Sequence, residues 1–162
     1  MHTDREDRTL FLFLIDATGF LERIADLLLN IGMVSPQISY DTELADQIAP
    51  RLSRQLMLVV KMVEDAIVAF TVGDTALARD VIVRDLDIDA EHRSICDDIP
   101  VLIEGGDKGP TAIRTALIFN TISYNIERIG DNATNIAESA IYHAEGKNAR
   151  HVSIASAAND EM

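Results

Sequence analysis

The sequence is poor in the residues on which disulfide scaffolds and nucleic-acid binding depend. Its 162 residues include one cysteine, Cys96, so no intrachain disulfide can form, and there is no tryptophan. Lysine occurs only three times, and the formal net charge is −13. Phosphate backbones and anionic lipid surfaces are bound by clustered lysine and arginine side chains. This charge balance therefore argues against nucleic acid as a partner and against membrane binding by bulk electrostatics.

Long uncharged apolar runs are also missing. The apolar run at residues 10–15 is followed by Asp16, Glu22, Arg23 and Asp26 within the length that a membrane span needs. Each charge near the centre of a span costs roughly 2.5 to 3.5 kcal/mol on insertion scales. The N-terminus lacks the basic region and small-residue cleavage site of a secretory signal. The sequence therefore predicts a cytoplasmic protein without a membrane span.

The sequence does have aliphatic residues at helical spacing. Apolar residues make up 48% of the chain and aromatic residues 5%, which is typical of helix bundles with cores of Leu, Ile, Val and Ala. No stretch alternates with a period of two, and Gly and Pro occur at the breaks. The predicted helices cover residues 9–35, a second stretch that begins at Leu44 or Pro50 and ends at Gly73, and residues 75–103 and 111–144. We therefore predict an all-α antiparallel helical bundle.

Two of these helices carry copies of one motif. Residues 21–31 align with residues 126–136, and Glu, Arg, Ile, Asp, Asn and Ile coincide at six of the eleven positions. Ala25 aligns with Gly130, a small residue with a small residue. Agreement of charged and apolar residues together indicates an internal repeat.

In the second copy, Glu127 and Asp131 lie one helical turn apart on the face opposite an apolar stripe. The first copy repeats this acidic pair as Glu22 and Asp26. The stripe of the second copy consists of Ile118, Ile122, Ile126, Ile129, Ala133, Ile136 and Ala140. Each of the two helices is thus expected to bury one side and to present oxygen atoms on the other.

The chain resembles the PhoU-like family of phosphate transport regulators over about residues 51–146. The specific motif is Ile-Glu-Arg-Ile-Gly-Asp-Asn-Ala-Thr-Asn-Ile-Ala-Glu at residues 126–138, supported by Gly73-Asp74 and by Arg-Asp-Leu-Asp-Ile-Asp at residues 84–89. Members of this family usually carry two tandem three-helix units, each ending in such a helix. The resemblance thus implies two tandem units, of which this chain would hold one and part of another.

On this basis we divide the chain into three parts. Residues 1–40 are interpreted as a helix resembling the last helix of a preceding unit, residues 41–146 as a PhoU-like three-helix unit, and residues 147–162 as a disordered tail. The chain is then either a shortened family member or a piece of a longer protein. Since the usual partners of the first helix are absent, a homodimer that supplies them is expected.

The resemblance implies a metal site made from two acidic pairs on the last two helices, Asp85 with Asp89 and Glu127 with Asp131. Side chains four residues apart on a helix lie about 5 to 6 Å apart at Cβ, close enough to share a cation. Oxygen ligands suit Mg²⁺, Mn²⁺, Ca²⁺ or iron. The resemblance favours iron or zinc among the divalent and trivalent ions.

Three further residues are candidates for this site. Glu22 and Asp26 repeat the acidic pair, and His92 follows Asp89 by about one turn and offers a ring nitrogen. Alternatively, these residues have no role in metal binding: the acidic side chains would lie on the solvated face of a helix, and the histidine would form hydrogen bonds. Cys96 on the same stripe is interpreted as a small buried side chain.

The resemblance implies a regulator of phosphate transport and phosphate signalling. Such a protein would act as a metal-binding adaptor for a phosphate ABC transporter or a sensor kinase, peripheral to the membrane through those protein partners. It would not be an enzyme, since the sequence has no nucleophile–base set and no glycine-rich phosphate loop. The alternatives are a carboxylate bundle that stores metal and a cytoplasmic helical module of a larger phosphate transporter.

Overall fold

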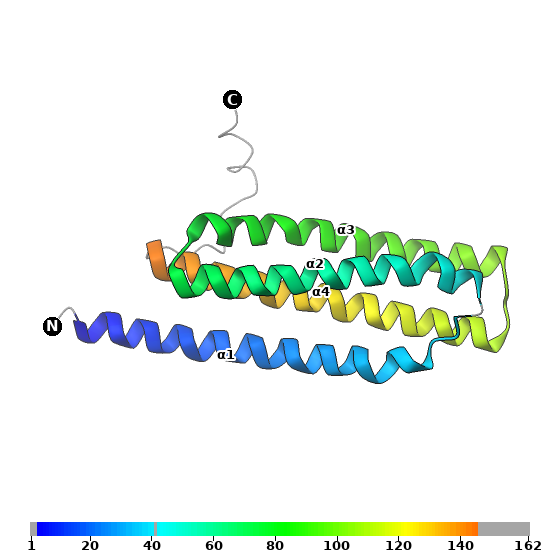
Figure 1. Cartoon of the computed structure of the whole chain (residues 1–162), viewed down its shortest axis with the longest axis horizontal. Coiled ribbons are helices and arrows are strands. Elements are labelled where there is room, and N and C mark those ends of the chain that lie inside the picture. Colours follow the sequence, from blue (N-terminus) through cyan, green and yellow to red (C-terminus); the bar gives the residue numbers. More distant parts are fainter. Residues whose placement is uncertain (1–2, 41, 146–162) are drawn as a thin grey trace, which may run out of the picture.

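The computed structural model describes residues 3–40 and 42–145. Figure 1 shows the long helices of the chain lying side by side. They are α1 (Thr3–Val34), α2 (Glu43–Val72), α3 (Thr75–Gly105) and α4 (Pro110–Glu145), with the short 3-10 helix η1 (Ser35–Gln37) after α1. The described residues contain no strand, and the all-α bundle is confirmed. The predicted disordered tail lies outside the described residues.

Local signals in the sequence place the breaks between helices. Gly73 adopts a left-handed conformation, with φ 72°, and ends α2 as a C-cap. Asp74 then accepts a hydrogen bond from the backbone N–H of Leu77, at 2.9 Å, and caps the start of α3. Thr42 caps α2 in the same way, through the backbone N–H of Ala45 at 3.1 Å. The turn between α2 and α3 is therefore readable from the sequence.

Two prolines lie inside helices rather than at their ends. Of the two starts that the sequence left open for α2, the structure has the earlier one, at Glu43, and Pro50 lies in the second turn of that helix. Pro100 lies near the end of α3, which continues to Gly105. The buried side chains of Ile48, Leu52 and Ile99 lie beside these prolines and favour the helical turns, although each proline removes one backbone donor.

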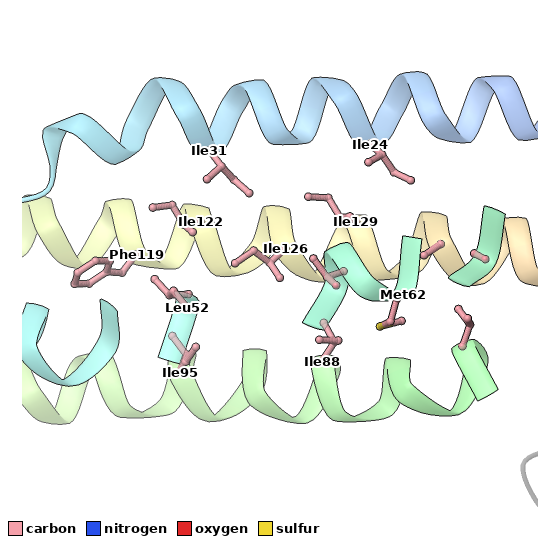
Figure 2. Close-up of a cluster of buried hydrophobic side chains, with 14 of the residues drawn as sticks. Ile24, Ile31, Leu52, Met62, Ile88, Ile95, Phe119, Ile122, Ile126 and Ile129 are labelled. Atoms are coloured by element: carbon pink, nitrogen blue, oxygen red, sulfur yellow. The ribbon is translucent and has the colours of Figure 1, made fainter. Parts of the chain in front are cut away.

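Helix α4 is the centre of the bundle, because α1, α2 and α3 all pack against it. Helix α4 is buried on two sides, whereas α1 packs extensively only on α4 and on η1. Figure 2 shows Ile24 and Ile31 of α1 directed toward Ile129 and Ile122 of α4. The chain thus forms a three-helix unit, α2 to α4, with α1 on the outer side of α4. None of the described helices is long and apolar enough to cross a membrane.

Candidate functional site

The two predicted acidic pairs meet between α3 and α4. Asp85 and Asp89 project from α3, and Glu127 and Asp131 project from α4. The first three side chains are half-buried, and Asp131 stands at the exposed edge. The neighbouring apolar stripes turn both helices into this orientation; they include Val81 and Ile88 on α3 and Ile126, Ile129 and Ala133 on α4. Packing of the core thereby brings carboxylates from two helices close together.

Gly130 creates the space that Asp85 occupies. A Cβ atom at position 130 would lie 2.6 Å from Asp85 Oδ1, closer than real Cβ atoms approach, and 3.5 Å from Ile88 Cγ2. Glycine is costly in the middle of a helix, so its presence there requires a packing reason. Here the reason is that the Asp85 carboxylate rests against the backbone of α4. The internal repeat indicated only that position 130 needs a small residue. A glycine in the middle of a helix could have indicated that another group approaches the backbone closely at this position.

Asp85, Glu127 and Asp131 all have raised pKa values, through burial and through neighbouring negative charges. Burial raises the pKa of Asp85 to about 7, and the charges of Asp89, Asp131 and Glu127 add to this shift. The pKa of Glu127 is raised by burial, then by Asp131 and Asp89. The pKa of Asp131 is raised by desolvation and by Asp89, against the opposing charge of Arg128. Four acidic groups thus form one electrostatic cluster, whose ionised form is unfavourable without a compensating positive charge.

Several polar atoms in this cluster are buried without a partner. Asp85 Oδ1, Glu127 Oε2 and the hydroxyl oxygen of Thr134 are buried and have no hydrogen-bond partner among the described residues. The Thr134 hydroxyl lies near enough to favour ionised Asp85 and lower its pKa, but it makes no hydrogen bond of regular geometry. Unpartnered buried oxygen atoms of this kind are costly, and a cation or a water molecule would satisfy them.

The arrangement as it stands is not a closed metal site. Across residues 3–40 and 42–145, no three His, Cys, Asp or Glu side chains are close enough together to hold a metal ion. The donor chemistry suits hard cations, since the cluster consists of carboxylates with unpartnered oxygen atoms. Binding an ion would therefore require these side chains to move closer together.

His92 and Cys96 of α3 contact α4 beyond the carboxylates. His92 Nδ1 lies 2.8 Å from the Ser123 hydroxyl oxygen on α4. The Cys96 thiol donates to the side-chain oxygen of Asn120, at 3.2 Å, and burial raises the pKa of this thiol. In this structure His92 is a hydrogen-bonded residue between two helices. The serine and asparagine were not identified from the sequence, because small polar residues on a helix carry no signal of their own.

Glu22 and Asp26, the first copy of the acidic pair, are in a different position. Both are exposed on α1. No hydrogen bond or ion pair of either residue is found within the described part of the chain. The structure therefore does not bring them to the cluster between α3 and α4.

Ion pairs between α2 and α3 hold the helix that carries half of the cluster. Arg51 Nε lies 2.7 Å from Glu91 and its Nη1 lies 2.6 Å from Asp98. Arg84 reaches Asp65 of α2 at 2.8 Å. These arginines are half-buried, so their pairs are better shielded from solvent than exposed pairs. Helix α3 is therefore fixed in rotation with Asp85 and Asp89 toward α4.

Comparison with known proteins supports one family. The PhoU domain family matches residues 52–140. A phosphate-specific transport system accessory protein PhoU homolog from Thermotoga maritima is 31% identical over 128 residues, covering 79% of this chain and 53% of the relative. A homolog of the same name from Caulobacter vibrioides is 33% identical over 125 residues, 77% of this chain and 52% of the relative. The chain spans about half the length of these curated relatives.

Two solved structures share the fold. The crystal structure of PhoU from Pseudomonas aeruginosa superposes with a TM-score of 0.79 at 28% identity, covering 88% of this chain and 66% of that one. The phosphate transport system regulatory protein PhoU from Streptococcus pneumoniae superposes with a TM-score of 0.75 at 22% identity, with 88% and 65% covered. The latter likeness supports the fold alone.

Proposed function

The chain belongs to the PhoU domain family, and from this premise we propose that it regulates phosphate transport and phosphate signalling as a cytoplasmic adaptor. Its named relatives are accessory proteins of phosphate-specific transport systems. The proposed partner is the cytoplasmic part of a phosphate ABC transporter or a sensor kinase. A net charge of −13 suits a partner with a basic surface, since complementary charge speeds association and selects against wrong partners.

We further propose that the cluster of Asp85, Asp89, Glu127 and Asp131 binds a divalent or trivalent cation, with iron or zinc favoured over Mg²⁺, Mn²⁺ and Ca²⁺. The observation that carries this proposal is the pair of buried, unpartnered carboxylate oxygens in this cluster, where burial and neighbouring negative charges raise the pKa values of Asp85, Glu127 and Asp131. A bound cation would supply positive charge, favour the ionised carboxylates and hold α3 and α4 together. The surface offered to the regulatory partner would then depend on metal.

Metal binding is tested with two double variants that change the charge equally. Glu127→Gln with Asp131→Asn removes the α4 half of the cluster, and Glu22→Gln with Asp26→Asn removes the exposed copy on α1. We expect the wild-type chain to keep a stoichiometric ion through dialysis. The α4 variant should lose at least about 10-fold in affinity for iron or zinc, while the α1 variant binds as the wild type does. Equal loss in both variants would show attraction by overall negative charge and reject the site.

The regulatory role is tested separately from metal. A host that lacks its own PhoU gene is complemented with the wild-type chain and with the two double variants, and phosphate uptake and phosphate-responsive transcription are measured. Restoration by the wild type and by the α1 variant, but not by the α4 variant, is expected. Restoration by all three proteins would support the adaptor function and would show that it does not depend on metal binding by the cluster. Failure of the wild-type chain to restore either readout would reject the regulatory function for this chain.

A further inference from the structure

A groove between α2 and α3 contains polar side chains that have no partner within the described residues. Its volume is about 420 Å³, within the range of about 300 to 1,000 Å³ that is typical of sites for small molecules. Two of its lining residues, Arg51 and Glu91, form an ion pair with 2.7 Å between Nε and Oε1. The other lining residues are Arg54, Gln55 and Leu58 of α2 and Asp87, Ile88 and Ala90 of α3.

This groove is separate from the acidic cluster and from α1. The cluster lies between α3 and α4, whereas the groove lies between α3 and α2. Helix α1 packs extensively only on α4 and η1. Figure 1 shows α1 and α3 on opposite sides of the bundle, with α2 and α4 between them. The helix that resembles the end of a preceding unit is therefore on the far side of the bundle from α3 and does not cover the groove.

Gln55 is the buried polar residue of the groove, with 2% of its surface exposed. Its Nε2 donates a hydrogen bond to the backbone carbonyl of Ile88, at 3.0 Å, which fixes the amide between the two helices. Its Oε1 is buried and has no hydrogen-bond partner among the described residues. Such an acceptor is costly, so a ligand gains affinity by donating an N–H to it. Access to this oxygen requires a lining side chain to turn aside, and Leu58, which exposes 56% of its surface, has room to do so.

The groove also has one arginine and one aspartate whose charges are not paired. Arg54 on α2 and Asp87 on α3 are both exposed. Neither forms a hydrogen bond or an ion pair within residues 3–40 and 42–145, with each other or with any other group. Arg51, in contrast, is held by Glu91 and Asp98. The groove thus offers a ligand one positive group, one negative group and one buried acceptor.

We propose that this groove binds a free α-amino acid with an aliphatic side chain. The ammonium group of the ligand donates to Gln55 Oε1 and to the carboxylate of Asp87, and its carboxylate accepts from the guanidinium of Arg54. The aliphatic side chain packs on Leu58 and Ile88. Each unpartnered group of the groove is thereby satisfied once. This inference does not depend on the phosphate role or on metal.

Charge favours this class of ligand over other small molecules. An ammonium and a carboxylate group on the same carbon occur together in a free amino acid but not in a residue within a peptide. The ligand has no net charge, whereas a nucleotide carries negative charge and is repelled by a chain with a net charge of −13. The apolar lining, which includes Leu58, Ile88 and Ala90, favours a branched aliphatic side chain over the hydrogen atom of glycine.

Titration of the full chain with L-leucine, followed by NMR, tests binding and its place. The side-chain amide resonances of Gln55, identified by their absence from Gln55→Met, should shift with a dissociation constant below about 1 mM. Gln55→Met and the replacement of leucine by glycine should each weaken binding at least about 10-fold, through loss of the acceptor and of the apolar contact. The absence of any shift with leucine, isoleucine and valine at about 10 mM would overturn the proposal.

Two charge variants and two modified ligands test the roles of the charged groups. Arg54→Gln and Asp87→Asn alter exposed side chains, so the fold is retained, and each should weaken leucine binding at least about 10-fold. The matched controls Arg23→Gln and Asp26→Asn, at exposed positions of α1, should bind leucine as the wild type does.

The modified ligands assign each charge to its partner. Leucinamide lacks the carboxylate, so Arg54→Gln should not weaken its binding further. N-acetylleucine lacks the ammonium group, so Asp87→Asn should not weaken its binding further. Equal weakening by the controls on α1, or the same dependence on Arg54 for leucine and leucinamide, would reject the assigned site.

Discussion

Helices α4 and α1 contain the same motif in two different surroundings. On α4 the motif is enclosed by α1, α2 and α3, and Glu127 is half-buried beside Asp85 and Asp89 of α3. On α1 the equivalent Glu22 is exposed, because α1 packs extensively only on α4 and η1. A similar sequence therefore provides a clustered acidic site in one helix and a solvated face in the other. The number of neighbouring helices accounts for the difference, since burial and nearby charges are what perturb a carboxylate.

The two copies also differ at the position where the neighbouring helix comes closest. Gly130 leaves room for the Asp85 carboxylate, whose Oδ1 lies 2.6 Å from where a Cβ would stand. Its counterpart on α1 is Ala25, which already carries a Cβ. Another helix could not place a carboxylate against α1 in the same way. The two copies are therefore related in sequence but are not equivalent as sites.

The largest expected contrast is between two equivalent apolar residues. Ile126→Ala removes a fully buried side chain from the centre of the bundle and should lower the free energy of unfolding by about 3 kcal/mol. Leu21→Ala at the equivalent, exposed position of α1 should cost less than about 1 kcal/mol in the monomer. Urea unfolding at low protein concentration measures both values. Equal costs would show that Leu21 is buried in the folded chain.

The second contrast concerns pH. The pKa of Asp85 is about 7 in the folded chain against an ordinary value of 3.8, so the folded state holds this proton more tightly than the unfolded state. The contribution of Asp85 to stability is thus fully present below about pH 4 and is lost as the pH rises through about 7. The Asn side chain of Asp85→Asn stays neutral, so this variant should be more stable than the metal-free wild type at pH 8 by about 2 kcal/mol. This value is about half of the free energy that corresponds to the whole pKa shift, because the carboxyl group is partly solvated.

The matched control for this measurement is Asp26→Asn, on the exposed copy of the motif. Thermal unfolding of both variants in the presence of a chelator, from pH 4 to pH 8, provides the comparison. Only Asp85→Asn should flatten the loss of stability between these pH values. A wild-type protein whose stability rises steadily over this range would contradict the burial of Asp85.

The third contrast tests the space beside Gly130. Gly130→Ala should destabilise the protein by about 1 kcal/mol, because the displaced Asp85 carboxylate costs more than the gain in helix propensity. In an Asp85→Ala background the same change should stabilise by about 1 kcal/mol, since the obstructing atom is gone. A double-mutant cycle by urea unfolding measures this reversal of sign. If the effects of the two substitutions on the free energy of unfolding are additive, the side chain of Asp85 does not limit the space at Gly130.

The smallest expected effect lies on α1. A Cβ at Gly19 would meet nothing within 4 Å. Gly19→Ala should therefore stabilise the chain by about 0.5 kcal/mol through helix propensity alone, in contrast to Gly130→Ala. Circular dichroism melting detects a gain of this size as a small rise in Tm. A loss of stability would show that α1 is packed on this side as well.

The sequence was sufficient to predict the helical bundle and the places where its helices are interrupted. Apolar residues every three or four positions identified the helices, and Gly73-Asp74 marked the turn between α2 and α3 because both residues act locally. It left open where α2 begins, since Pro50 is compatible with either a first turn or a position inside a helix. That choice was decided by burial of Leu44, Ala45 and Ile48, which extends the helix to Glu43.

The candidate site was predicted only in part. Helical spacing put Glu127 and Asp131 on one face of a helix, but spacing within one helix does not show which other helix lies opposite. The contact of Asp85 with the backbone at Gly130 and the unpartnered oxygen atoms depend on the rotation of α3, which Arg51 and Arg84 help to hold. Such relations join residues far apart in the chain and leave no periodic signal.

The amino-acid sequence alone determined that this chain forms long helices, where most of them end, and that two of them share one motif, because these properties depend on residues within a few turns of one another. The tertiary structure alone decided in which copy of the motif the acidic side chains are clustered and partly buried, and in which copy they are exposed to solvent. The physical reason is that burial and charge interactions are set by neighbours in space, and α4 has three neighbouring helices whereas α1 packs extensively against only one.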